Sequence, residues 1–164
     1  MIGKYNLINR LAEIGERVDI GNFNIIRHSV KIGDDTVIRN YVEIRSNVRI
    51  GSKCYIDSGV KFSGKALIGN NVTIRYDSII ARDVEIMDNA FISPQVGFIN
   101  IPFKDNMKQH DKTVIGRGCR IGFNSTINCG VHIANGVFIG AKSLVLKDID
   151  KWGTYVGVPV RRIN

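Results

Sequence analysis

A large aliphatic or aromatic residue recurs every six residues along almost the whole chain. There are 23 such positions, and 20 of them are Ile, out of 26 Ile in the chain, so chance phasing is not a credible explanation. The positions are Ile2, Ile8, Ile14, Ile20, Ile26, Ile32, Ile38, Ile44, Ile50, Ile56, Phe62, Ile68, Ile74, Ile80, Ile86, Ile92, Phe98, Ile115, Ile121, Ile127, Ile133, Ile139 and Val145. Neither helical periodicity nor simple alternation produces this pattern over such a length. Short strands joined by tight turns every six residues do.

A second interval groups the six-residue units in threes. Gly15, Gly33, Gly51 and Gly69 follow one another at intervals of 18 residues, which predicts triangular coils with three sides of six residues. We therefore expect an all-β fold, a parallel β-solenoid whose coils stack about 4.8 Å apart. The repeat predicts one domain, with the β-helix over 1–150 and a capping segment over 151–164. Leu7, Leu11 and Ile14 have helical spacing, so the N-terminus is either a short cap helix or a ragged first coil.

The periodicity fails once, between Phe98 and Ile115. Long irregular segments in a regular domain are usually functional, so we expect a protruding loop at about 99–114 with the chemistry close to it. Residues 18 apart lie one above another in the predicted solenoid. Arg39, Asp57 and Arg75 are therefore expected to form a charge ladder, unless Arg75 contacts a ligand instead.

Composition narrows the class of protein. The net charge of +8 comes from scattered Lys and Arg, which argues against nucleic acid as a partner and favours small anionic ligands such as phosphates. No apolar run is long enough for a transmembrane helix, and no signal peptide is evident. Cys54, Cys119 and Cys129 show no metal-binding spacing, and we expect reduced thiols in a cytoplasmic protein.

Two stretches resemble a known family. The repeats from Thr113 to Asp148, and the ending Tyr155–Ile163 with its Gly157–Val158–Pro159 turn before basic residues, are similar to the left-handed β-helix, hexapeptide-repeat acyltransferases. The handedness rests on this resemblance and not on the periodicity. The resemblance implies acetyl transfer from acetyl-CoA without a metal, and a homotrimer with active sites between its subunits.

Within that family, the nucleotide-linked 3-amino sugar N-acetyltransferases are most similar. They share a Gly-Asn-Asn-Val stretch, here Gly69–Val72, then a polar triplet, then Phe-x-Asn before a Pro, here Phe98–Asn100 and Pro102. The triplet is Arg75–Tyr76–Asp77, where that subgroup has Gln-Asn-Asn. A subgroup acting on 4-amino sugars carries a His-Asp pair where this chain has Arg82–Asp83, which counts against it.

The resemblance also implies roles for individual residues. Asn100, Asp77 and His110 are the catalytic candidates, because Asn100 can orient the acceptor, Asp77 can hydrogen-bond it or accept its proton, and His110 can act as a base. Arg75, Tyr76 and Pro102 are expected to bind the nucleotide sugar. The coenzyme is expected to pair with backbone groups and to place its phosphates against cations. The residues concerned are Gly122, Gly140, Ala141, Lys147, Arg161 and Arg162.

Four functions compete on these residues. A neutral sugar amine can attack a thioester unaided, which makes the protein an N-acetyltransferase in surface polysaccharide or glycan biosynthesis. A sugar hydroxyl needs a base, for which His110 is the candidate. A zinc carbonic anhydrase on the same solenoid needs three ligand histidines, two of them close in sequence, and His28, His110 and His132 are far apart. A non-catalytic solenoid leaves the loop and the ending unexplained.

Overall fold

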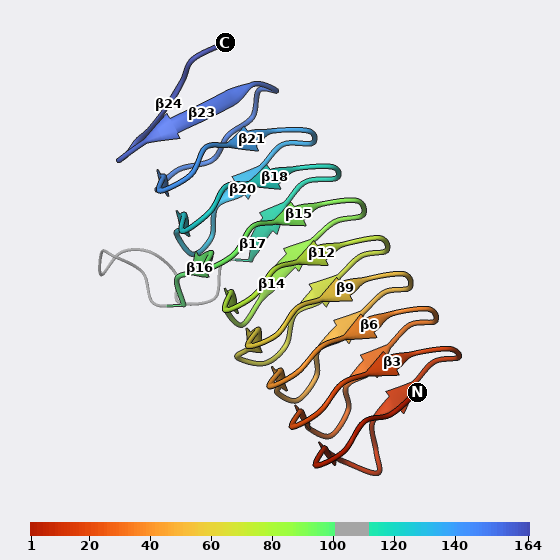
Figure 1. Cartoon of the computed structure of the whole chain (residues 1–164). Helices are drawn as coiled ribbons and strands as arrows, with labels where there is room; N and C mark the ends of the chain where they lie inside the picture. Colours follow the sequence, from red (N-terminus) through yellow and green to blue (C-terminus); the bar gives the residue numbers. More distant parts are fainter. Residues whose placement is uncertain (101–111) are drawn as a thin grey trace.

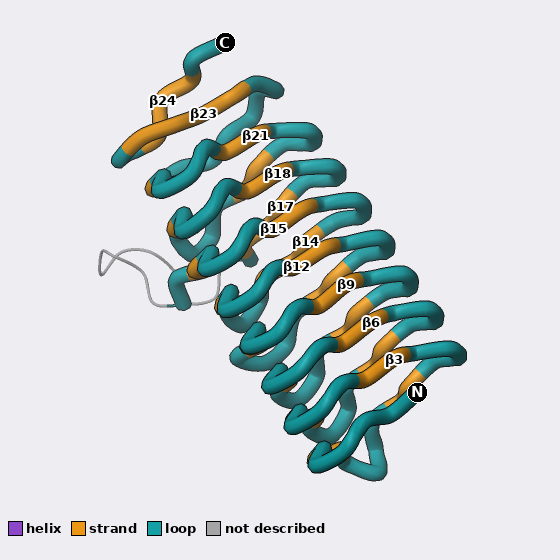
Figure 2. The backbone as a smooth tube through the Cα atoms, viewed as in Figure 1, coloured by secondary structure: helices purple, strands orange, loops and turns teal. Residues whose placement is uncertain are grey.

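The computed structural model describes residues 1–100 and 112–164 and is a β-solenoid of stacked coils (Figure 1). Almost every coil has three strands, one in each of three parallel sheets that we call A, B and C. The tube in Figure 2 shows that each strand is short and that turns make up the rest of each coil. The described residues contain no helix, so none of them forms a helix that could span a membrane.

The strands of the three sheets follow one another along the chain. Sheet A contains β3 (Asp19–Ile20), β6 (Val37–Ile38), β9 (Tyr55–Ile56), β12 (Thr73–Ile74), β15 (Phe91–Ile92), β18 (Arg120–Ile121), β21 (Phe138–Ile139), β23 (Thr154–Gly157) and β24 (Val160–Arg162). Sheet B contains β1 (Leu7–Ile8), β4 (Ile25–Ile26), β7 (Glu43–Ile44), β10 (Lys61–Phe62), β13 (Ile79–Ile80), β16 (Gly97–Phe98), β19 (Thr126–Ile127) and β22 (Leu144–Val145). Sheet C contains β2 (Glu13–Ile14), β5 (Lys31–Ile32), β8 (Arg49–Ile50), β11 (Leu67–Ile68), β14 (Val84–Ile86), β17 (Thr113–Ile115) and β20 (His132–Ile133).

The six-residue repeat corresponds directly to the core. Its Ile and Phe residues end the strands and point inward, and from Ile20 to Val145 each is at most 6% exposed. Burying one such side chain contributes about 1.5–3 kcal/mol before conformational entropy is subtracted. The prediction of an all-β, triangular solenoid is confirmed.

The small residues four positions after each repeat residue fill the inner side of the turns. Some are polar, and their hydroxyl groups are satisfied by carbonyl groups of the coil above. Thr36 Oγ1 donates to Gly51 O at 2.9 Å, and Ser78 Oγ donates to Ser93 O at 3.0 Å. This pairing satisfies the buried hydroxyl groups, whereas Nδ2 of Asn24 in the same column has no hydrogen-bond partner among the described residues.

The N-terminal segment is a first coil, which resolves the alternative left open by the sequence. Ile2 forms a bridge with Ile20, and β1 and β2 pair with β4 and β5. Leu7 and Leu11 are 67% and 63% exposed, so their helical spacing does not reflect a packed helix face.

The structure adds two details to the sequence-based expectation for the second half. β17 begins at Thr113, so the regular structure resumes two residues before Ile115. Beyond Val145 the chain forms an antiparallel hairpin, β23–β24, and β23 extends sheet A beside β21. Figure 1 shows this hairpin across the last coils.

Candidate functional site

The triplet Arg75–Tyr76–Asp77 forms a turn between β12 in sheet A and β13 in sheet B. We call the column of turns that joins these two sheets the AB corner. Asp77 has a left-handed backbone with φ of 57°, which a short polar side chain tolerates better than most. Tyr76 and Asp77 are both exposed.

Arg75 is fixed by two contacts on the sheet A side of this corner. Its Nε lies 3.3 Å from Asp57 Oδ2, and its guanidinium carbon lies 5.8 Å from the centre of the Tyr55 ring. The Asp57 carboxylate is only 14% exposed. The predicted charge ladder is present for this pair, while Arg39 makes no ion pair within the described part of the chain.

Gly122, Gly140 and Ala141 lie at the same corner, higher in the stack. Backbone hydrogen bonds connect successive turns of the corner, from Gln95 N to Tyr76 O, Asn124 N to Pro94 O, and Lys142 N to Phe123 O. The level of Ala141 is therefore three coil steps from that of Tyr76, or about 14 Å at the usual strand spacing. The fold thus places the predicted acceptor triplet and the predicted coenzyme glycines along one edge.

The close approach of successive coils explains why Gly122 and Gly140 have no side chain. A Cβ on Gly122 would lie 2.5 Å from Ala141 N, and a Cβ on Gly140 would lie 2.6 Å from Val156 Cγ1. Their amides donate to Ile139 O and Tyr155 O, each at 2.8 Å. Among the amides of Gly122, Gly140 and Ala141, only that of Ala141 has no hydrogen-bond partner among the described residues. Its N–H is therefore available to donate to a ligand.

The outer face of sheet B separates the AB corner from the opposite edge of the sheet. In β13, β16, β19 and β22 its outward residues are Ile79, Gly97, Thr126 and Leu144, aligned by the strand register. No atom lies within 4 Å of the position that a Gly97 Cβ would occupy. This part of the sheet presents small and apolar groups, and Gly97 leaves space above the backbone.

Asn100 lies at the far edge of that face. It follows β16 by two residues, at the turn toward sheet C, and it is exposed. Asp77 and Asn100 therefore lie on opposite edges of sheet B, in consecutive coils, and do not meet within one chain. The two remaining loop candidates, Pro102 and His110, lie outside the described residues.

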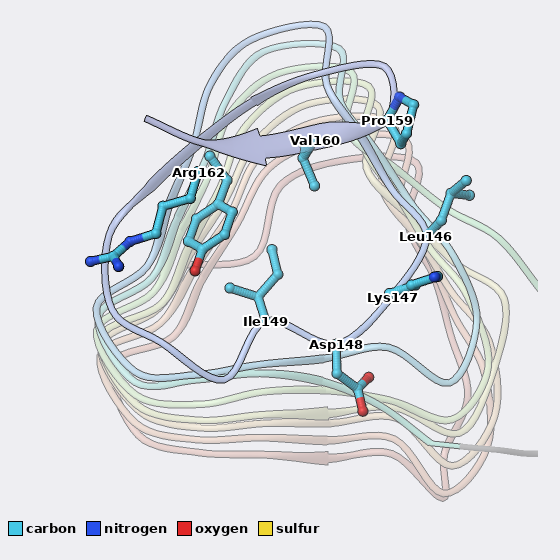
Figure 3. A pocket seen from close by; sticks show the side chains of 8 residues that line it. Leu146, Lys147, Asp148, Ile149, Pro159, Val160 and Arg162 are labelled. Atoms are coloured by element: carbon cyan, nitrogen blue, oxygen red, sulfur yellow. The ribbon is translucent and has the colours of Figure 1, made fainter. Parts of the chain in front are cut away.

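Lys147 and Arg162 both lie at the C-terminal end of the solenoid, on opposite sides of one hollow (Figure 3). They line a cavity of about 310 Å³ with Ile149, Tyr155 and Val160. In Figure 3, Ile149 and Val160 point into the hollow, whereas Arg162 points away from it. Arg161 also lies in β24 and is exposed. All three predicted cations therefore lie at the C-terminal end of the solenoid. Lys147 follows β22, at the edge of sheet B opposite the AB corner, and is separated from that corner.

The two described histidines, His28 and His132, both lie away from Asp77. His28 is exposed on a turn beside Ser29, and His132 faces outward from sheet C. The His132 ring Nε2 lies 3.0 Å from Lys112 O. Because a carbonyl only accepts, Nε2 is the donor in this hydrogen bond. Sequence spacing did not indicate this contact, because Lys112 lies outside the repeat.

Two of the three thiols are structural. Cys54 and Cys119 are 1% and 0% exposed, and burial raises the pKa of each thiol. Their sulfur atoms lie 3.0 Å from Gly69 O and Ala134 O. A neutral, buried thiol is not a nucleophile. In residues 1–100 and 112–164, no three His, Cys, Asp or Glu side chains are grouped as metal ligands would be.

The repeat matches a family model. The model, described as bacterial transferase hexapeptide (six repeats), matches residues 11–46, 29–64 and 112–147. These segments together cover more than half of the chain. The chain belongs to the bacterial transferase hexapeptide family. This membership indicates the left-handed form of the β-helix.

Individual relatives of this hexapeptide protein are similar over different shares of the chain. The "Putative lipopolysaccharide biosynthesis O-acetyl transferase WbbJ" of Escherichia coli (strain K12) is 34% identical over 98 residues, which are 57% of this chain and 50% of WbbJ. The chain therefore spans about half the length of that relative.

Solved structures share the fold over nearly the whole chain. AntD, an N-acyltransferase from Bacillus cereus crystallised as a point mutant with dTDP and coenzyme A, has a TM-score of 0.55 and 26% identity, covering 99% of this chain and 82% of AntD. LpxA, a UDP-N-acetylglucosamine acyltransferase from Bacteroides fragilis 9343, has a TM-score of 0.79 and 23% identity, covering 96% of this chain and 72% of LpxA. The second likeness concerns the fold alone.

Proposed function

We propose that the protein is an acyltransferase that moves an acetyl group from acetyl-CoA to the amino group of a nucleotide-linked amino sugar. The reaction would serve surface polysaccharide or glycan biosynthesis in the cytoplasm. The observation that carries the proposal is the match of the repeats to the transferase hexapeptide family. Support for the substrate classes comes from AntD, an N-acyltransferase crystallised with a nucleotide and coenzyme A.

The chemistry requires few side chains. The amine nitrogen attacks the thioester carbonyl and the carbon–sulfur bond breaks. The one proton that the amine loses ends on the departing sulfur, so coenzyme A leaves as the thiol. A neutral amine needs no base for the attack itself. We assign Asp77 to hydrogen-bond the acceptor substrate or to accept this proton, and Asn100 to orient the acceptor. Arg75, Tyr76 and Pro102 would bind the acceptor substrate.

The donor would lie along the AB corner toward the C-terminal end. The free Ala141 amide would pair with the pantetheine arm, beside Gly122 and Gly140, which allow the coils to approach closely. Lys147, Arg161 and Arg162 would contact the phosphates of coenzyme A, as cations at the C-terminal end of the solenoid.

An assay of thiol release tests the proposal. Acetyl-CoA is supplied with a panel of nucleotide-linked amino sugars and with matched sugars that carry a hydroxyl in place of the amine. We expect turnover with at least one amine and none with its hydroxyl analogue. Asn100→Ala and Asp77→Asn should lower kcat/KM about 10-fold or more, in the range typical of general acid–base and positioning groups. Binding of acetyl-CoA without turnover on any amine or hydroxyl acceptor would refute the proposal.

A second candidate is transfer to a sugar hydroxyl, favoured by the similarity to WbbJ, which is named as an O-acetyl transferase. A hydroxyl must lose its proton as it attacks, so this reaction needs a base, and His110 is the candidate. The His110→Ala variant separates the two reactions. Unchanged turnover in that variant would eliminate His110 as the base.

We further propose that the active form is a homotrimer with its sites between subunits. In one chain Asp77 and Asn100 lie on opposite edges of sheet B, so an edge of a second copy is required to bring both residues to one substrate. Sedimentation equilibrium should give three times the chain mass of 18.3 kDa. A fully active monomer would contradict this assembly.

A further inference from the structure

Three aromatic residues occupy strained positions at the N-terminal end of the AB corner. Tyr5, Phe23 and Tyr41 have φ of 58°, 59° and 58°, in the left-handed region that bulky side chains rarely adopt. At the same position in later coils the corner carries Gly59, Asp77, Gln95, Asn124 and Lys142. The turns of the solenoid enforce this backbone in coil after coil, here even on bulky side chains.

The three rings form a continuous stack on the surface. The ring centres of Tyr5 and Phe23 are 5.0 Å apart with an interplanar angle of 13°, and those of Phe23 and Tyr41 are 5.1 Å apart with an angle of 3°. The side chains remain 74%, 46% and 63% exposed. The ring spacing follows the coil spacing, so each coil adds one ring to the stack.

The stack ends at a gap one coil above Tyr41. The next residue of the column is Gly59, which has φ of +75° and no side chain. Its amide donates to Asn40 O at 3.0 Å, which fixes it directly above the Tyr41 turn. One face of the Tyr41 ring packs on Phe23, and the other face has no ring partner among the described residues. A planar group could therefore continue the stack in the space beside Gly59.

A carboxylate closes the inner end of this gap. Asp77 lies one coil beyond Gly59, and a Cβ on Gly59 would collide with Asp77 Oδ1. The carboxylate oxygen thus lies beside the Gly59 backbone, in the coil that follows Tyr41. An aromatic face with an acceptor at its edge matches a heterocycle that carries N–H donors.

Two free cations lie beside the gap. Arg39 begins the turn that contains Tyr41, and Lys61 follows Gly59 in β10 with its side chain outward. Both are exposed, and neither forms an ion pair within residues 1–100 and 112–164. They provide the positive charge that phosphates next to a heterocycle require.

We propose that the gap at Gly59 is a nucleobase subsite and that it takes the guanine base of a nucleoside diphosphate. Stacking on Tyr41 holds the base, and the Asp77 carboxylate accepts hydrogen bonds from its edge. Guanine presents two parallel N–H donors there, whereas uracil and thymine flank their one ring N–H with two carbonyl groups that repel a carboxylate. Arg39 and Lys61 contact the phosphates.

This inference rests on the proposed function, because it assigns the nucleotide part of the acceptor substrate to this corner. Of the two roles proposed for Asp77, it selects the hydrogen bond to the acceptor substrate, which Asp77 makes to the nucleobase. The sugar then continues along the corner toward Tyr76, so that the subsite orients the amine without touching it.

Isothermal titration calorimetry of the full chain with GDP and with UDP tests the subsite. We expect GDP to bind more tightly than UDP. Tyr41→Ala should weaken GDP binding about 10-fold, because stacking on one aromatic side chain is typically worth about that much. Tyr41→Phe should retain the affinity within about twofold. Gly59→Asn, which tolerates the left-handed backbone, fills the gap and should abolish GDP binding.

Tyr5→Ala is the matched control. Tyr5 is the other end of the same stack and has the same residue type and backbone conformation, but the residue above it is Phe23 and not the glycine that leaves the gap. It should leave GDP affinity unchanged within about twofold, and thermal melts show whether each variant is folded. Equal effects of Tyr5→Ala and Tyr41→Ala on GDP binding would overturn the subsite. Equal affinity of UDP and GDP, both dependent on Tyr41, would overturn the assignment to guanine.

Turnover separates this inference from the proposed function. GDP binding that depends on Tyr41, without acyl transfer to any acceptor, would support the subsite and contradict the proposed reaction. Thiol release with amino sugar nucleotides that is unaffected by Tyr41→Ala and Gly59→Asn would support the reaction and contradict the subsite.

Discussion

Neighbouring residues in each two-residue strand face opposite environments. In β13 the side chain of Ile79 is 48% exposed on the outer face of sheet B, whereas that of Ile80 is fully buried in the core. The two residues have the same chemistry and nearly the same backbone, so their contributions to stability differ through burial alone. They form a matched pair for measuring how much the core contributes.

We expect Ile80→Ala to lower the free energy of unfolding by about 2–5 kcal/mol, because it removes buried methyl groups and leaves a cavity between two coils. Ile79→Ala should cost only about 0.5 kcal/mol, since an exposed side chain loses little on truncation. Urea denaturation followed by circular dichroism measures both values. Similar losses for the two variants would mean that the outer face of sheet B is covered, as an interface between copies would cover it.

Several site features could be predicted from residue spacing, and others could not. The Asp57–Arg75 pair follows from the interval of 18, since register in a solenoid is fixed by the repeat. The roles of Gly122 and Gly140 do not follow, because a glycine needed for coil packing and a glycine needed for a ligand look the same in a sequence. Only the hydrogen bonds show that their amides are occupied and that of Ala141 is not.

At the scale of elements, regular repeats were predictable and interruptions were not. The strands could be placed because each carries an inward Ile or Phe. The β23–β24 hairpin has no such period, because its residues close an end and do not stack between two coils. Thr113 was also assigned to the loop, although its side chain is buried and its hydroxyl accepts from Gly130 N at 2.9 Å. A buried Thr outside the repeat gave no signal in the sequence.

The whole molecule determines which predicted site residues meet. One stack of coils puts the Arg75–Tyr76–Asp77 triplet and Ala141 on one edge, and Asn100 and Lys147 on turns at the other side of sheet B. The interval of 18 gives the corner of a residue only within an unbroken run of coils, so the break between Phe98 and Ile115 leaves the corners of Ala141 and Lys147 to the structure. The column of Tyr5, Phe23 and Tyr41 follows from the interval of 18, but the parallel contact between their rings is seen only in the structure.

The solenoid also predicts a gradient of local stability along its axis. Each coil contacts only its neighbours, so the first coil has a partner on one side only. Its inward residues Ile8 and Ile14 are only partly buried, whereas Ile74 and Ile86 in the middle are 0% exposed. At the other end the β23–β24 hairpin covers part of the last coils. Opening the N-terminal coil should therefore require much less free energy than opening the middle.

Hydrogen exchange measured by mass spectrometry tests this gradient. The amides of Leu7 and Glu13 donate to the second coil at 2.8 and 2.9 Å, and those of Thr73 and Ile79 donate between central coils at 3.0 and 2.9 Å. Since these hydrogen bonds are alike in length, a difference in exchange reports coil opening and not bond geometry. We expect peptides containing β1 and β2 to exchange at least about 100-fold faster than peptides containing β12 and β13, because local openings span the range from near zero to the global free energy of unfolding. Equal protection in both regions would show that the whole stack opens as one unit, or that another molecule covers the first coil. Repeating the measurement over a range of protein concentrations separates these two causes, because only coverage by a second copy depends on concentration.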